Sequence, residues 1–346
     1  MTRIFTIMTT CAAIALAAQA AAETGFVQFD LQTDHHAAPL DAAMFYPAAA
    51  GGDPITFGRN PVFTGIQVSQ DAPIADGNHP IVLMSHGLGG NYRVLSWLAR
   101  DLAEAGAIVI AVNHPNSTTF DVDPQLSLHH WTRAQDMSAA LDHVIDTYGD
   151  YVDTSRVMAS GFSYGGWTAL SLGGQTGNHA GYVSHCEEDA EASTHCQDII
   201  RAGGDLAAIP AEDWNASYRD DRVTHVAAID PGLIYGAEAV NGAGMEADAL
   251  LIQLGSGENR HYATDIDRSG FGDVVAHERV TIDPAHHISA LMTCRPGGWL
   301  FLKVTFDYPV CDDPQGSDRA AVHAQISAEM IEHFGLVPQL AQVAAD

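Results

Sequence analysis

The sequence has little positive charge, and this shortage limits the partners that the protein can bind. It contains 15 Lys and Arg residues against 43 Asp and Glu residues, and Lys303 is its only lysine, so the formal net charge is −28. A surface this acidic repels phosphate backbones, which argues against nucleic-acid binding. It also disfavours adsorption to anionic membranes. No feature of the sequence indicates a partner protein.

Long apolar runs are also missing beyond the first residues. After Arg3, an Ala-rich apolar run extends to about residue 18, and the small-x-small sequence Ala18-Gln19-Ala20 follows it. This pattern is typical of a secretory signal peptide, here residues 1–22, rather than of a buried helix. No later run reaches the ~18 apolar residues of a membrane-spanning helix. We therefore expect a secreted or periplasmic protein without a stable membrane anchor, in which residues 23–346 form one large domain.

Cysteine is scarce, and its spacing is informative. Cys11 lies in the predicted signal peptide, which leaves Cys186, Cys196, Cys294 and Cys311. An even number of cysteines in an exported chain indicates disulfides. Four cysteines allow three pairings, and their grouping favours Cys186 with Cys196 and Cys294 with Cys311. No Cys-x-x-Cys spacing supports the alternative, a zinc site.

Short apolar runs alternate with helical patterns along most of the chain. Strands are predicted at 80–85, 107–113, 156–160, 223–229, 249–254 and 278–282, and helices at 94–105 and 132–147. Because the runs are almost continuously apolar, they indicate a mostly parallel, doubly wound sheet that is covered on both faces, the α/β class. Alternating patterns such as 26–31 predict antiparallel edge strands near the N-terminus. Residues 173–221 break the rhythm, and they are either a cap insertion or a solvated surface excursion.

The candidate nucleophile is Ser163, in the sequence Gly161-Phe162-Ser163-Tyr164-Gly165. This sequence follows a predicted strand and precedes a helical run at 167–172. A strand, a tight Gly-x-Ser-x-Gly turn and a helix resemble the nucleophile elbow of α/β-hydrolases. The turn leaves no room for side chains beside the serine, which explains the two glycines, and it exposes the serine hydroxyl above the sheet.

A second glycine-rich turn, residues 85–90 (SHGLGG), ends an earlier strand. In this fold it can present a backbone N–H toward Ser163, so the amides of Leu88 and Tyr164 are candidate oxyanion donors. The alternative is an ordinary strand-to-helix turn. His86 is expected to be structural, because the base of such a site follows the last strand.

Two histidines and two acids are candidates for the groups that activate the serine, which needs a base to remove its proton. His286 and His287 follow the last predicted strand, where α/β-hydrolases place the base. Asp230 and Glu258 each follow a predicted strand, and either could orient the histidine. Asp230 is favoured because a rigid Pro-Gly turn follows it, whereas Arg260 could hold Glu258 in an ion pair.

These motifs together resemble a known family. The turn SHGLGG, the elbow GFSYGG, the sequence IDPG at 229–232 and the segment from His287 to CRPGG at 294–298 resemble bacterial proteins labelled predicted dienelactone hydrolases, which are similar to platelet-activating factor acetylhydrolases. The likeness extends from about Gly25 to Leu336. It implies Ser163 as the nucleophile, His287 as the base and Asp230 as the acid. True dienelactone hydrolases use a cysteine where this chain has Ser163.

The sequence therefore predicts a serine carboxylic ester hydrolase that works through an acyl-enzyme, without a metal or cofactor. Its substrate is expected to be a small-molecule or polymeric ester with a short acyl or an aryl group, among them phospholipids like platelet-activating factor, phthalate esters and polyesters. Two alternatives stay open at this point. The same residues could hydrolyse amides or peptides, or the fold could serve as a binding module without catalysis.

Overall fold

The computed structural model describes residues 23–189, 193–305 and 307–336. The predicted signal peptide, residues 1–22, lies outside the described residues. Within the described ranges, no helix is both long enough and apolar enough to span a membrane.

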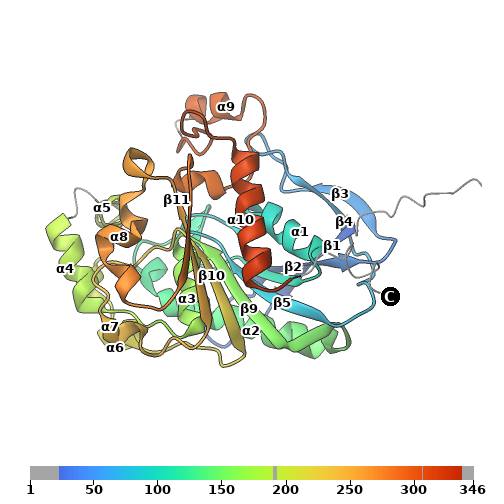
Figure 1. The fold of residues 1–346 in the computed structure, drawn as a ribbon, viewed down its shortest axis with the longest axis horizontal. Helices are drawn as coiled ribbons and strands as arrows, with labels where there is room; N and C mark the ends of the chain where they lie inside the picture. Colours follow the sequence, from blue (N-terminus) through green and yellow to red (C-terminus); the bar gives the residue numbers. More distant parts are fainter. Residues whose placement is uncertain (1–22, 190–192, 306, 337–346) are drawn as a thin grey trace, which may run out of the picture.

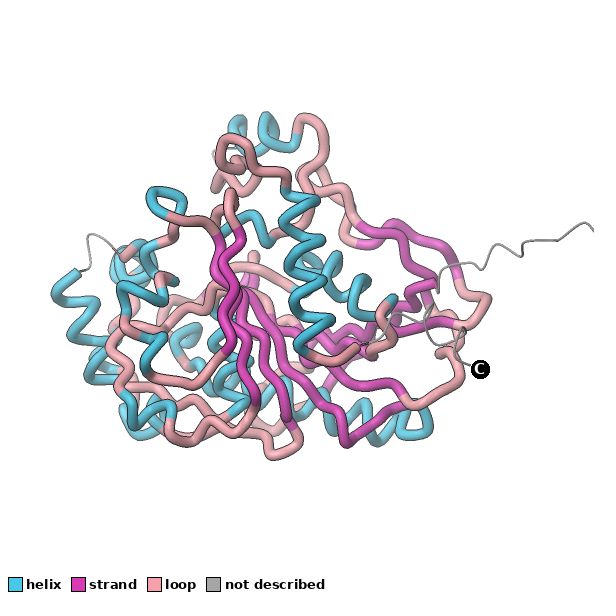
Figure 2. Tube along the Cα trace, in the orientation of Figure 1, coloured by secondary structure: helices cyan, strands magenta, loops and turns pink. Residues whose placement is uncertain are grey.

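One ten-stranded sheet forms the centre of the molecule, with the strand order β12-β11-β10-β9-β5-β6-β2-β1-β4-β3. Figure 2 shows the strands in magenta, with helices around them. The six strands from β12 to β6 are all parallel, which confirms the predicted fold class. The strands of this sheet are β1 (Glu23–Leu31), β2 (Leu40–Ala48), β3 (Asp53–Phe57), β4 (Ile66–Gln70), β5 (His79–Ser85), β6 (Ile108–Val112), β9 (Val152–Phe162), β10 (Val223–Ile229), β11 (Asp248–Leu254) and β12 (Glu278–Ile282).

Helices cover both faces of the sheet, as the apolar strands require. Along β6, Ile108 and Ile110 pack into one core, and Val109 and Ala111 pack into the other. The first core includes residues of α2 (His130–Tyr148) and α3 (Tyr164–Gly173). The second includes residues of α1 (Ser96–Glu104) and α10 (Arg319–His333), which lie together on the other face (Figure 1). Both surfaces of each central strand are therefore buried.

The N-terminal strands continue this sheet rather than forming a separate one. β1 pairs antiparallel with β2, and β2 pairs antiparallel with β6, so the direction of the strands reverses next to the parallel part. β3 pairs antiparallel with β4. The prediction of antiparallel N-terminal strands is confirmed, with one parallel contact between β1 and β4.

Residues 173–221 contain no strand among those described and are mostly helical. They include α4 (His179–Asp189), α5 (Thr194–Ala202) and α6 (Ala211–Asn215). The segment packs beside α2, because His130 bonds the carbonyl of Trp214 at 3.0 Å. It also contacts the loop before α2, where the Asp205 amide donates to Gln125 at 2.8 Å. Whether this segment acts as a cap stays a prediction.

Two disulfides link peripheral segments of the chain, and the cysteines pair as predicted. Cys186–Cys196 links α4 to α5, and Cys294–Cys311 closes a loop that contains α9 (Gly298–Thr305). The remaining short strands and α-helices are β7 (Ser117–Thr118), β8 (Asp121–Val122), α7 (Ala239–Gly242) and α8 (Ile266–Ser269). Because each loop is short, a bridge of this kind contributes about 3 kcal/mol in the chain-entropy account of disulfides.

Candidate active site

Ser163 lies in a strained turn between β9 and α3. Its backbone has φ +56° and ψ −119°, in the left-handed half of the map that residues with a side chain rarely adopt. Such a conformation costs about 1–3 kcal/mol, so the surrounding structure has to hold it. The Ser163 amide donates to the Ile229 carbonyl at 2.8 Å, and the Gly232 amide donates to the Ser163 carbonyl at 2.9 Å. The turn is thus tied to the end of β10 on both sides.

The glycines around Ser163 are required by close backbone contacts. A Cβ at Gly161 would collide with the carbonyl of Gly165, and a Cβ at Gly165 would collide with the carbonyl of Ser85. A Cβ at Gly87 would come within 3.2 Å of the Ser163 side chain. The turn after β5 therefore lies directly against the serine.

The structure brings together three side chains from different loops, here named the candidate triad: Ser163, His287 and Asp230. His287 Nε2 lies 3.1 Å from Ser163 Oγ, and His287 Nδ1 lies 2.9 Å from Asp230 Oδ2. Each residue follows the carboxyl end of a parallel strand, so the fold gathers them at one edge of the sheet. Asp230 is fully buried, and its Oδ1 accepts a hydrogen bond from the Leu254 amide at 2.8 Å.

The other candidates from the sequence lie elsewhere. Glu258 is exposed in a short 3₁₀ turn, Gly257–Asn259, and among the described residues no hydrogen bond or ion pair joins it to His287. From the sequence, Arg260 could hold Glu258 in an ion pair. No such ion pair occurs among the described residues. His286 turns its ring back onto its own segment, where Nδ1 accepts from the Ile288 amide at 3.5 Å. Of the two histidines, only His287 reaches Ser163.

The two candidate oxyanion donors belong to segments that adjoin Ser163. Tyr164 follows it directly and begins α3, where the helix dipole favours negative charge. Leu88 is in the turn that touches Ser163, and its amide makes no hydrogen bond to another described residue. Neighbouring amides are engaged, since Gly89 donates to the Ser117 carbonyl at 2.9 Å and Gly90 to the Gly87 carbonyl at 3.0 Å. The arrangement is compatible with two donors aimed at one point.

One histidine at the site was not found from the sequence. The ring of His261 stacks on that of His287, with centroids 4.6 Å apart and an interplanar angle of 19°. The ring of Phe162 contacts His287 as well, at 4.5 Å. His261 belongs to no motif and follows β11 by several residues, so only the folded chain reveals its position.

A second hydrogen-bonded series, here named the buried chain, lies behind the turn after β5. Ser85 Oγ is 2.9 Å from His114 Nε2, and His114 Nδ1 is 2.8 Å from Asp136 Oδ2. All three side chains are buried, and Arg133 also bonds Ser85 Oγ at 3.1 Å. Burial, followed by the charge of Arg133, lowers the pKa of His114 to about 4. His86 is buried beside this series and accepts a hydrogen bond from the His114 amide at 3.1 Å; its structural role stays a prediction.

The pKa of Asp136 is set by two opposing effects. Burial raises it, but hydrogen bonds from three histidines outweigh burial and hold the pKa of this carboxyl below its usual range. Two of these histidines are His35 and His36, which with Asp136 form a group that could hold a metal ion. That group is separate from the candidate triad.

Comparisons with known proteins agree with this architecture. Residues 61–123 match the family model of platelet-activating factor acetylhydrolase, isoform II, and residues 93–186 match that of the prolyl oligopeptidase family. No sequence relative is found among curated proteins.

A solved esterase structure shows the same fold, and a second solved structure is similar. A ferulic acid esterase from Streptomyces cinnamoneus aligns with a TM-score of 0.55 and 16% identity, over 93% of this chain and 91% of that chain. A dienelactone hydrolase-like promiscuous phosphotriesterase from metagenomic libraries aligns with a TM-score of 0.49 and 17% identity, over 90% of this chain and 98% of that chain. The chain therefore has the fold of the ferulic acid esterase, and the two family models that match its segments are both models of hydrolases, which indicates a hydrolase.

Proposed function

We propose that the protein is an exported serine carboxylic ester hydrolase, with Ser163 as nucleophile, His287 as base and Asp230 as the orienting acid. One observation carries the proposal. Ser163 Oγ lies 3.1 Å from His287 Nε2 in a strained elbow, and the other nitrogen of the same ring lies 2.9 Å from a buried carboxylate. This is the geometry that general-base activation of a hydroxyl requires.

The proposed reaction proceeds through an acyl-enzyme. Asp230 accepts the Nδ1 proton of His287, which leaves Nε2 free to accept the proton of Ser163 Oγ. The serine oxygen attacks the ester carbonyl, and the amides of Leu88 and Tyr164 stabilise the negative charge that develops on the carbonyl oxygen. The imidazolium then donates its proton to the leaving alcohol. A water molecule repeats these steps on the acyl-enzyme and releases the acid.

Exposed apolar side chains lie on a hairpin joined to the turn after β5, and they support an apolar acyl or aryl group in the substrate. The hairpin β7–β8 is joined to the turn after β5, because the Thr119 amide donates to the Gly90 carbonyl at 3.0 Å. At its tip Phe120 is 99% exposed, and Val122 in β8 is 49% exposed. A short-acyl or aryl ester, or the surface of a polymeric ester, could contact these side chains while its carbonyl lies at Ser163.

Export is the second part of the proposal. The two disulfides support it, because disulfides persist in oxidising compartments. We expect the mature protein to contain no free thiol. Alkylation of the unreduced protein, followed by peptide mapping, would show unmodified Cys186 and Cys294 in bridged peptides. Quantitative alkylation of these cysteines without reductant would contradict export to an oxidising compartment.

The decisive experiment combines active-site labelling with a substrate series. A fluorophosphonate probe should label Ser163, and p-nitrophenyl esters of increasing acyl length should be hydrolysed with a preference for short chains. Omission of metals and cofactors should leave the rate unchanged. A protein that is neither labelled nor active on any ester would instead be a binding module on this fold.

Hydrolysis of amides is the second candidate, because the match to the prolyl oligopeptidase family includes Ser163. The same triad can cleave either bond, and the leaving group decides which reaction is faster. Matched ester and anilide substrates with one acyl group separate the two functions. A higher kcat/KM for the anilide would assign the protein to the peptidases.

A further inference from the structure

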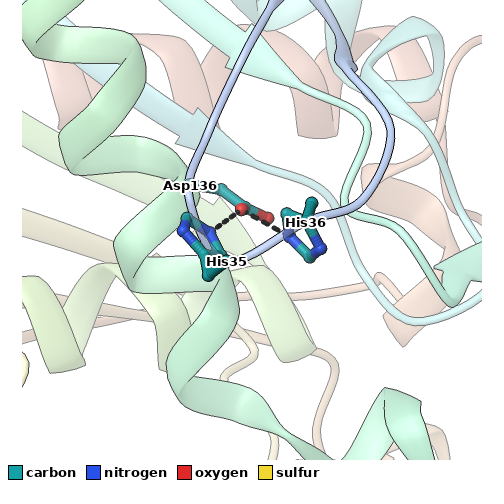
Figure 3. Close-up of side chains that lie close together, drawn as sticks. All are labelled: His35, His36 and Asp136. Atoms are coloured by element: carbon teal, nitrogen blue, oxygen red, sulfur yellow. Dashed lines mark hydrogen bonds and ion pairs between the residues drawn. The ribbon is translucent and has the colours of Figure 1, made fainter.

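A cluster of metal-ligand side chains lies between α2 and the loop 32–39, which joins β1 to β2. In that loop, His35 and His36 each place Nε2 against the same oxygen, Oδ1 of Asp136 in α2, at 2.7 and 2.8 Å (Figure 3). The three atoms lie within 4.8 Å of one another. In the part of the chain that the structure describes, no other group of three or more His, Cys, Asp or Glu side chains meets this criterion.

We propose that His35, His36 and Asp136 bind one divalent transition-metal ion of the zinc class, and that the ion ties the loop 32–39 to α2. Two imidazole nitrogens and one carboxylate oxygen suit Zn²⁺, Co²⁺, Ni²⁺ and Cu²⁺, whereas Mg²⁺ and Ca²⁺ prefer oxygen ligands. Three protein ligands leave the fourth position of a tetrahedral ion for water.

One half of the proposed site is rigid. Asp136 is fully buried in α2, and its second oxygen, Oδ2, is held by His114 Nδ1 at 2.8 Å. Oδ1 is therefore directed toward the loop and cannot turn away. Hydrogen bonds of this kind orient the ligands of known metal sites and contribute to their affinity.

The other half of the site can adjust and is open to solvent. The side chains of His35 and His36 are 25% and 11% exposed, which gives an ion a path of entry and a place for a water ligand. With metal–ligand distances of ~2.0–2.1 Å, the ligands of a tetrahedral zinc ion lie roughly 3.4 Å apart. The two rings therefore need to withdraw from Asp136 by less than ~1 Å, and both belong to a surface loop.

Hydrogen bonding without an ion is the competing explanation for this cluster. Each neutral imidazole can donate one N–H to Asp136, and nothing further is then needed. Glutamine separates the two explanations, because its amide also donates to a carboxylate but is a poor ligand for zinc-class ions. The variant His35→Gln/His36→Gln should keep the hydrogen bonds and lose the ion, and the single variant His36→Gln is a milder form of the same test.

A matched control is available in a pair of histidines from β10 and α10, which does not include α2 or the loop 32–39. The rings of His225 and His333 have centroids 5.5 Å apart and lie near carboxylates, with His225 Nε2 3.9 Å from Asp248. This pair also consists of two histidines near carboxylates. Its two rings do not, however, bond the same buried carboxylate oxygen, as His35 and His36 do. The variant His225→Gln/His333→Gln therefore removes two imidazoles without touching the proposed site.

The experiment uses the untagged, metal-stripped protein. Co²⁺ is titrated and followed by its visible absorption, Zn²⁺ is titrated by calorimetry, and Mg²⁺ is included for comparison. The parent should bind one equivalent of Co²⁺ or Zn²⁺ and show a higher Tm with the ion. Mg²⁺ should neither bind measurably nor raise the Tm. The affinity should fall by at least ~100-fold in His35→Gln/His36→Gln and stay at the parental value in His225→Gln/His333→Gln.

Three outcomes would overturn the proposal. They are a parent that binds no equivalent of Co²⁺, a loop variant that binds like the parent, and an equal loss in the loop and control variants. If the double variant does not fold, the single variant His36→Gln decides by the same criteria. Because none of these three readouts measures ester turnover, the result is independent of the proposed function.

Discussion

The molecule contains two series of serine, histidine and aspartate side chains joined by hydrogen bonds of nearly equal length. In the candidate triad the two distances are 3.1 and 2.9 Å, and in the buried chain they are 2.9 and 2.8 Å. Distance alone therefore does not distinguish a reactive serine from a structural one.

The surroundings of the two serines differ in three respects. Ser163 lies in a strained elbow, against a turn that carries amides, whereas Ser85 ends a regular strand. Ser85 is 1% exposed and its hydroxyl is shared with Arg133, so an ester carbonyl cannot approach it. His114 is also buried, whereas the side chain of His287 is 13% exposed. Access, backbone strain and the candidate oxyanion donors, rather than the hydrogen-bonded series itself, are therefore the basis on which we propose Ser163 as the reactive serine.

The largest expected difference is between the two serines. Ser163→Ala should lower ester turnover by about 10⁶, the scale of loss of an essential nucleophile. Ser85→Ala should leave turnover within a few-fold of the parent and lower the free energy of unfolding by about 1 kcal/mol, because it removes a buried hydrogen bond. Steady-state kinetics and urea unfolding measure the two effects. Equal losses of turnover would remove the distinction between the two series.

The two neighbouring histidines give the next contrast. His287→Ala should match the loss at Ser163, because no other base reaches the serine oxygen within the described residues. His286→Ala should cost much less, since that ring bonds only its own segment. Circular dichroism of both variants controls for folding. A larger loss at His286 would show that the base had been assigned to the wrong residue.

The turnover of the two acid variants should differ by a smaller factor than the turnover of the two serine variants. Asp230→Asn should reduce turnover by about 10⁴, because the amide no longer fixes the correct tautomer of His287. Glu258→Gln is the matched control, since it makes the same chemical change in an exposed residue after the next strand. Its turnover should stay near the parental value. Near-parental activity in Asp230→Asn together with a collapse in Glu258→Gln would transfer the role to Glu258.

Much of the fold could be predicted from the sequence because central strands of a covered sheet are continuously apolar. β10 and β12 have the predicted bounds, 223–229 and 278–282. β9 was predicted at 156–160 but begins at Val152, since the polar residues Asp153, Thr154 and Ser155 hide its first half. Those residues lie outside the buried part of the sheet, where apolar patterning no longer applies.

The candidate site was less accessible to prediction, because its parts come from different loops. Ser163 was identified from a local motif, which needs only the strand, the turn and the helix around it. The choice between Asp230 and Glu258 depends on which loop folds toward His287, and both loops follow parallel strands. The contact of His261 with His287 depends on the path of a loop that carries no motif. The catalytic roles of Ser163, His287 and Asp230 stay predictions.

The smallest expected effect concerns stability, and it separates buried histidines from exposed ones. Burial lowers the pKa of His130 to about 4, and burial together with Arg319 does the same for His323. In the unfolded chain both should titrate near ~6.5. Between these values the unfolded state binds more protons than the folded state, so the free energy of unfolding must fall as the pH is lowered from ~6.5 toward ~4.

The loss should be on the order of 2–3 kcal/mol for each buried histidine at the acid end of this window. His323 is the sharper test, because its ring stacks on Trp97 at 3.6 Å and its Nε2 bonds the carbonyls of Ser289 and Leu291, just after His287. Urea unfolding of the parent at pH 7 and pH 5 gives the slope, and His323→Gln should flatten it, since glutamine cannot be protonated. His277→Gln, at a partly exposed position, should leave the slope unchanged. An equal slope in all three proteins would mean that His323 binds its proton as readily in the folded state as in the unfolded one.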